Sequence, residues 1–262
     1  MVVVILFSGI LSAAAGEAGL LVEILSGLMI VGLMIGLLTL SAKLVRQVRT
    51  EQQNVETIGE LVQLRRWSEA GAQLDQYLSK PTRTQSARAQ ALVYLGAVLA
   101  RYQRFSDAIA VYDYLLESEM LDPGSNYGLR LGRAMAMLRE DHLVDADRAI
   151  SDLRRQTPPG VDSAGLALIE LYRDVKTGHA DDAISRFEKT LPAMQQQLGH
   201  RTGDAWGLVA RAYDLVNRPD AAQQAYRNAT LLSPPVELFR RYPEVQKLEG
   251  RYEPSYAPAE AA

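Results

Sequence analysis

The 262-residue sequence contains no cysteine. This absence excludes disulfide scaffolds, thiol nucleophiles, cysteine-type zinc sites and iron–sulfur clusters. Histidine is also scarce, with three residues, and no basic residue precedes Lys43. From Lys43 onward the charges nearly balance, with 29 acids (the 31 of the chain less Glu17 and Glu23) against 28 basic residues. This balance disfavours a nucleic-acid partner bound through bulk charge.

Charge is nearly missing from residues 1–42, which we predict to be a membrane leader. The apolar run 20–40 would span about 31 Å as a helix, close to the hydrocarbon thickness of about 30 Å. We therefore expect a transmembrane helix at about 20–41 and a juxtamembrane helix at 43–54. The shorter apolar run within 1–16 is either the first helix of a hairpin or a signal-like segment, with Ala13 and Ala15 as its cleavage pattern.

The charges that flank the long run predict its orientation. Lys43, Arg46 and Arg49 follow it directly, and basic flanks favour the cytoplasmic side of a membrane. We therefore expect one or two spans, with the rest of the chain on the cytoplasmic side. Within the run, Gly32 and Gly36 form a G-x-x-x-G pattern that would allow a homodimer, although glycine is also common in transmembrane helices.

Beyond the leader, a short pattern recurs five times. A small alanine is followed four residues later by a large apolar residue, and the alanines lie 38, 38, 37 and 39 residues apart, at Ala70, Ala108, Ala146, Ala183 and Ala222. Such regularity predicts an array of helix pairs, in which each pair buries its apolar face against its neighbours.

The last unit carries the most specific motif. Trp206, Val209, Ala210 and Tyr213 precede Ala222, Tyr226, Ala229 and Pro234 at the spacing of the tetratricopeptide repeat (TPR), which this unit resembles. The resemblance implies an all-α fold, an α-solenoid of about five TPR-like helix pairs over 55–235. In the fourth unit, Asp174 and Glu170 stand where apolar residues are expected, so this unit is either divergent or shifted in register.

The ends of the array and its turns can also be predicted. Residues 236–249 are expected to form a helix that caps the open face of the last pair, and 250–262 to be a disordered tail. Ser68, Ser106 and Asp220 are candidate N-caps of second helices.

Motifs for catalysis or cofactor binding are missing. The sequence has no H-E-x-x-H, no P-loop, no G-x-S-x-G and no dinucleotide-binding turn. His142 and His179 each lie beside aspartates, but both fall in turns where solvated polar residues are common. We therefore predict no enzyme activity, no cofactor and no metal.

The TPR resemblance implies that partners bind along the concave side, which the first helix of each pair lines. In this register the groove residues would be Val93, Ala97, Leu131, Met135, Leu168 and Tyr172. Their apolar character favours an apolar or amphipathic protein segment over the acidic tails that some TPR domains bind. The alternative is that tight stacking simply buries these helices.

Together these observations predict a membrane-anchored, TPR-like scaffold or adaptor that contacts a protein partner and the lipid bilayer. A structural subunit of a membrane protein complex is the alternative.

Overall fold

The computed structural model describes residues 16–82, 84–118, 120–121, 123–158 and 163–254, and no strand occurs among them. The chain forms two compact units, Met1–Ala91 and Leu92–Ala262, with the boundary inside one helix. The apolar segment predicted at the very N-terminus falls almost entirely on residues 1–15, outside the described residues.

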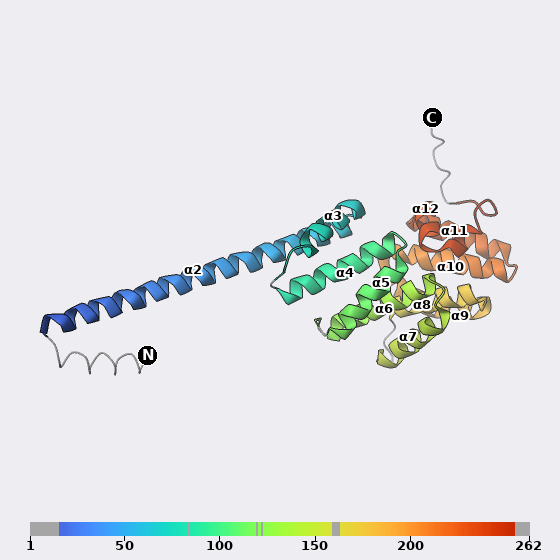
Figure 1. The fold of residues 1–262 in the computed structure, drawn as a ribbon. Helices are drawn as coiled ribbons and strands as arrows, with labels where there is room; N and C mark the ends of the chain where they lie inside the picture. Colours follow the sequence, from blue (N-terminus) through green and yellow to red (C-terminus); the bar gives the residue numbers. More distant parts are fainter. Residues whose placement is uncertain (1–15, 83, 119, 122, 159–162, 255–262) are drawn as a thin grey trace, which may run out of the picture. The chain divides into compact units, whose positions relative to one another are not determined.

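Unit 1 is dominated by one long helix, α2 (Gly16–Gln63), which Figure 1 shows as uninterrupted. Residues 25–46 of α2 are all exposed, and by length and composition the helix can cross a membrane. Its C-terminal end behaves differently, because Val55, Ile58 and Leu61 are buried at helical spacing. This end packs on α3 (Trp67–Leu78), whose buried face carries Ala70, Leu74 and Tyr77.

Helix α4 (Gln85–Arg101) begins in unit 1 and ends in unit 2. The other helices of unit 2 follow in hairpin pairs, with α5 (Phe105–Glu117) after α4, α6 (Pro123–Arg139) with α7 (Leu143–Gln156), α8 (Ala164–Thr177) with α9 (Ala180–Leu198), and α10 (Thr202–Leu215) with α11 (Pro219–Leu232). A short 3-10 turn (Gly199–Arg201) joins α9 to α10. Two short helices, α12 (Pro235–Arg241) and α13 (Pro243–Gln246), complete the unit.

The backbone of every pair turns in the same way. In each turn one residue has a φ between +57° and +82°, and these residues lie 38, 38, 37 and 39 positions apart, at Arg65, Gln103, Asp141, Gly178 and Asn217. In each turn the next N–H also reaches back five residues, as from Arg66 to the Leu61 carbonyl at 2.9 Å. This is the Schellman ending of a helix. The repeat seen in the alanines is therefore a repeat of backbone geometry, and the register of the fourth unit is regular.

The alanines that define the repeat mark the tight contacts within pairs, since all five are fully buried. The ring of Tyr112 on α5 lies against a glycine of its own pair and one of the next pair: an ideal Cβ on Gly96 of α4 would lie 2.4 Å from Tyr112 Cε1, and one on Gly132 of α6 would lie 3.3 Å from Tyr112 Cζ. Phe187 and Trp206 pack edge to face with centroids 4.7 Å apart.

The predicted N-caps are wrong by two positions. The helices begin at Trp67, Phe105 and Pro219, so Ser68, Ser106 and Asp220 lie inside the first turn. The preceding arginines make no side-chain cap. The Schellman turn leads directly into the second helix, and acids of the first turn pair with these arginines instead, as Glu69 does with Arg66.

Candidate functional site

Three helices, α4, α6 and α8, carry matching stripes of residues. We call the surface formed by these stripes and by helix α10 the first-helix face. On α4 the stripe is Val93, Ala97 and Arg101, and on α6 it is Leu131, Met135 and Arg139. On α8 it is Leu168, Tyr172 and Lys176. Members of a stripe are four residues apart and therefore share one helix face. The stripes contain all six residues predicted to line the groove, and each ends in a basic residue that the prediction missed.

The six predicted residues differ in how far they are covered. Val93, Ala97, Leu131 and Met135 are half-buried, whereas Leu168 and Tyr172 are only 2 % and 1 % exposed. Stacking between first helices explains part of this burial, because an ideal Cβ on Gly165 of α8 would lie 3.0 Å from Leu131 Cδ1. Their role in binding a partner stays a prediction.

The C-terminal segment, residues 235–249, lies on the basic ends of the stripes. Glu237 accepts two hydrogen bonds from the Arg101 guanidinium, at 2.7 and 2.9 Å. These bonds hold the pKa of the Glu237 carboxyl below its ordinary value. Further along, Lys176 Nζ lies 3.6 Å from the Glu244 carboxylate and 2.8 Å from that of Asp141. Acids of the segment thus meet the basic ends of the first and third stripes.

An aromatic and cationic cluster joins the same elements. The rings of Tyr172 and Tyr242 meet edge to face with centroids 5.1 Å apart, and the Tyr172 hydroxyl donates to Glu244 at 3.3 Å. The guanidinium of Arg139 lies 5.3 Å from the centroid of the Tyr242 ring, within cation–π range. Burial, and then the Glu244 carboxylate, raise the pKa of Tyr172, so its hydroxyl remains a hydrogen-bond donor.

Helix α10 completes the contact with the segment. Asp204 is fully buried, with its carboxylate 2.9 Å from Arg241 Nη2. Burial raises the pKa of Asp204, an effect that Arg241 opposes. The segment also inserts an apolar side, because four of its residues are fully buried, namely Leu238, Tyr242, Val245 and Leu248.

The segment was predicted to cap the open face of the last pair. It does pack on α10 of that pair, and its partners also extend back to the ends of α8, α6 and α4, so it lies along the first helices of four pairs. The predicted tail also begins too early. Arg251 and Tyr252 bond to Asp214 at 3.1 and 3.0 Å, so ordered chain continues past residue 250, whereas residues 255–262 lie outside the described part.

A buried ionic network occupies the fourth pair. Asp174 is 1 % exposed and pairs with Arg173 at 2.6 Å and Arg186 at 2.9 Å. Arg186 also pairs with Glu170 at 2.7 Å, and Arg154 contacts the same carboxylate. Glu170 and Asp174 are the two residues that broke the apolar pattern. Their spacing of four, with Arg186 one helix further on, was the available signal for a buried network.

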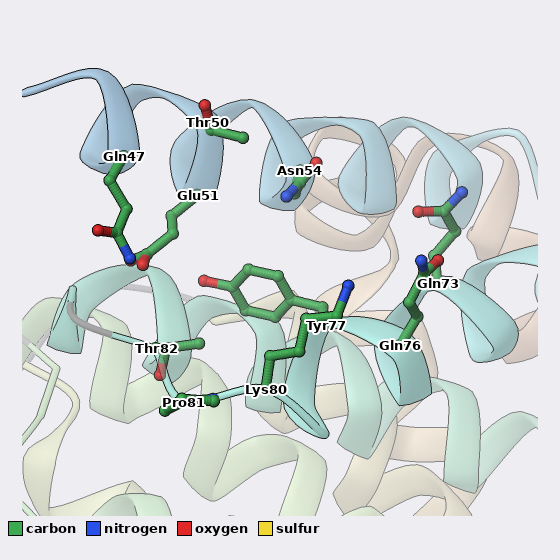
Figure 2. A pocket seen from close by; sticks show the side chains of 10 residues that line it. All are labelled: Gln47, Thr50, Glu51, Asn54, Gln73, Gln76, Tyr77, Lys80, Pro81 and Thr82. Atoms are coloured by element: carbon green, nitrogen blue, oxygen red, sulfur yellow. The ribbon is translucent and has the colours of Figure 1, made fainter. Parts of the chain in front are cut away.

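Unit 1 has a polar cavity of about 280 Å³ between α2, α3 and the turn after α3. Figure 2 shows Gln47, Glu51 and Tyr77 pointing into it. Tyr77 is 8 % exposed, and its hydroxyl has no hydrogen-bond partner among the described residues. Glu51 accepts a hydrogen bond from the Thr84 backbone N–H at 2.9 Å. The side chains that line the cavity include both hydrogen-bond donors and acceptors, and both a carboxylate and an ammonium group, so the lining does not favour a ligand of one charge.

The histidines do not assemble metal sites. The part of the chain that the structure describes has no group of three metal-ligating side chains. His179 Nδ1 lies 2.7 Å from the hydroxyl of Thr177, a contact within the turn between α8 and α9.

These features define a class: over the described residues, a helical protein built from repeated helix hairpins. No protein-family model matches the chain, and neither does any curated protein. Among solved structures, it is similar to YrrB, which is described as a TPR protein with an unusual peptide-binding site. The identity is 15 % and the TM-score 0.41, over 71 % of this chain and 87 % of that one. The fold assignment therefore depends on the hairpins themselves.

Proposed function

We propose that this protein is a membrane-anchored scaffold that binds a protein partner on the first-helix face. The observation that carries the proposal is the set of three stripes on α4, α6 and α8, each apolar at its start and basic at its end. Such a face suits an amphipathic segment, because apolar anchors supply affinity and charges set orientation.

The apolar half of α2 supports the anchor. Its residues 25–42 contact nothing that buries them within the described chain, and a bilayer would cover them. Lys43, Arg46 and Arg49 would then lie at the cytoplasmic surface, together with the hairpins. Flotation of the full chain on liposomes tests the anchor, and protease protection in sealed native membranes tests the side.

A second candidate function, a structural subunit of a membrane complex, is favoured by the free glycine face of α2. Nothing lies within 4 Å of an ideal Cβ on Gly32 or Gly36, so another helix could approach there, including that of a second copy. In this case the principal interface would be α2 and not the first-helix face.

Affinity recovery and crosslinking of the full chain from native membranes distinguish the two functions. The scaffold predicts that Val93→Arg with Ala97→Arg abolishes recovery of the partner, whereas Gly32→Ile with Gly36→Ile leaves it unchanged. The subunit predicts the reverse. Val144→Arg is the matched control, because Val144 is an exposed apolar residue on a second helix, α7. Recovery that survives both double variants would overturn both functions.

A further inference from the structure

We propose that residues 235–249 are an internal ligand of the first-helix face, and that the partner is a helical segment that copies their chemistry and displaces them. This inference rests on the proposed function, since it names the class of partner that the scaffold binds. The partner would present an acid, then an aromatic side chain, then a second acid, on a segment with one apolar side.

The extent of the contact is the first reason. A cap that only closes the last hairpin needs to touch α10 and α11. Here the segment reaches Arg101 at the end of α4 through a bidentate pair, and Gln103 donates to the Arg240 carbonyl at 3.4 Å. The segment therefore lies across the basic ends of the stripes, next to the apolar residues that the stripes offer to a partner.

The chemistry of the contact is the second reason, because each charged end of a stripe has its own counterpart. Arg101 receives Glu237, Arg139 receives the ring of Tyr242, and Lys176 receives Glu244. The three basic ends lie 38 and 37 residues apart, the period of the repeat itself. The repeat thus builds a row of three cationic positions, and a ligand of alternating acid and aromatic groups satisfies this row.

The incomplete bonding of this contact is the third reason. Three buried side-chain atoms of this contact lack a hydrogen-bond partner in the described residues, namely Arg139 Nε, Arg241 Nε and Glu244 Oε2. Buried polar atoms without partners lower the stability of a contact. The covalent link after α11 raises the effective concentration of the segment and so offsets part of this loss. A free partner can still compete for the face if its groups satisfy these unpaired atoms.

The test uses the full chain in lipid nanodiscs and a fluorescent peptide of residues 233–254 as the probe. In the wild type the internal segment occupies the face, which weakens the apparent affinity for the peptide. Glu237→Lys places a cation against Arg101 and should release the segment, so the peptide should bind about tenfold tighter or more. Glu249→Lys makes the same charge change at an exposed position of the segment and should leave peptide affinity unchanged.

A charge exchange keeps the test independent of misfolding. Adding Arg101→Glu to Glu237→Lys should restore the closed state, so that hydrogen exchange in residues 235–249 slows again to the wild-type rate. Hydrogen exchange of the wild type with excess peptide should become faster in residues 235–249. The proposal is overturned if the Glu237→Lys chain retains its helix content yet binds the peptide no tighter, or if peptide leaves exchange in 235–249 unchanged.

These outcomes are separable from the proposed function. Peptide binding is measured on pure protein, whereas the scaffold is tested by recovery from native membranes. If Glu237→Lys increases peptide affinity but the variant with Val93→Arg and Ala97→Arg still recovers the partner, the internal-ligand proposal is supported and the scaffold proposal is overturned. If neither the wild type nor the Glu237→Lys chain binds the peptide, but recovery of the partner depends on Val93 and Ala97, the scaffold proposal is supported and the internal-ligand proposal is overturned.

Discussion

The second hairpin (α4 and α5) and the fourth (α8 and α9) have turns of the same backbone conformation, but different kinds of contact hold their helices together. Around α4 and α5, the Tyr112 ring fills the space above Gly96, so shape decides the packing. Around α8 and α9, Arg186 bridges the carboxylates of Glu170 and Asp174 in a buried network. Yet Ala108 and Ala183, the tight contacts within each hairpin, are equally buried.

This difference teaches which part of the repeat is indispensable. The turn and the small alanine are present in both hairpins, whereas the large apolar positions can be exchanged for paired charges. The two hairpins are therefore destabilised by different substitutions. In the fourth hairpin the costly change is to remove one partner of a buried ion pair, whereas in the second it is to add volume where the Tyr112 ring packs against Gly96. The following substitutions exploit that contrast.

The largest effect is expected at Asp174. Asp174→Ala removes the buried carboxylate and leaves Arg186 and Arg173 with only their partners Glu170 and Asp147, which should lower the free energy of unfolding by about 3 kcal/mol. Urea titration of the full chain, followed by circular dichroism, measures this loss. Asp181→Ala, an exposed acid in the first turn of α9, is the control and should change little. A loss under about 1 kcal/mol at Asp174 would show that the network is not structural.

The matching test of shape is Gly96→Ala. Its new methyl group would lie 2.4 Å from Tyr112 Cε1, so the ring must move, at a cost of about 1–3 kcal/mol. Gly132→Ala faces the same ring at 3.3 Å and should cost less. Urea titration checks the order, and equal costs at the two glycines would show that the ring is free to move.

The sequence predicted the hairpins well because their signal is local. Ala108 and Ala183 recur at a fixed period, and each occupies the tight contact that its small size indicates. The six residues predicted to line a groove lie on the first helices α4, α6 and α8, and their role in binding stays a prediction. Periodicity along one helix is enough for such predictions, since residues four apart lie on one face.

What the sequence did not predict depends on distant pairing. Arg101 and Glu237 are separated by 136 residues, and no local pattern announces that they meet. Asp174 broke the apolar pattern, but Arg186, which neutralises it, lies on another helix, so the sequence indicated only a divergent unit or a shift in register. The missed N-caps have a local cause, since Ser68 carries the right side chain but the backbone turn already ends at Arg66.

The turns provide a test with opposite signs. Gly178 has φ +82° with open space around it, so Gly178→Ala adds only backbone strain and should cost about 1 kcal/mol. Gly128 lies inside α6, also with open space, so Gly128→Ala should instead stabilise by about 0.5–1 kcal/mol. Thermal unfolding of the two variants should move in opposite directions. A stabilising Gly178→Ala would contradict the left-handed turn.

The smallest effect concerns pH at the contact between Glu237 and the second hairpin. Because Arg101 lowers the pKa of Glu237, with Arg240 and Arg241 adding to it, the ionised carboxylate stabilises the fold at neutral pH. This contribution is complete above the ordinary glutamate pKa of about 4.3 and is lost as the pH falls through the lowered value.

The measurement is the difference in unfolding free energy between wild type and Glu237→Gln at several pH values. It should be about 1 kcal/mol or less at pH 7, should shrink as the pH falls through the lowered pKa of Glu237, and should vanish once both side chains are neutral. Glu249→Gln, exposed in the same segment, should show no such pH dependence. A difference that grows on acidification would mean that Arg101 does not stabilise the charged form. The acids of the segment would then contribute to its docking through shape alone, as Tyr112 does in the second hairpin.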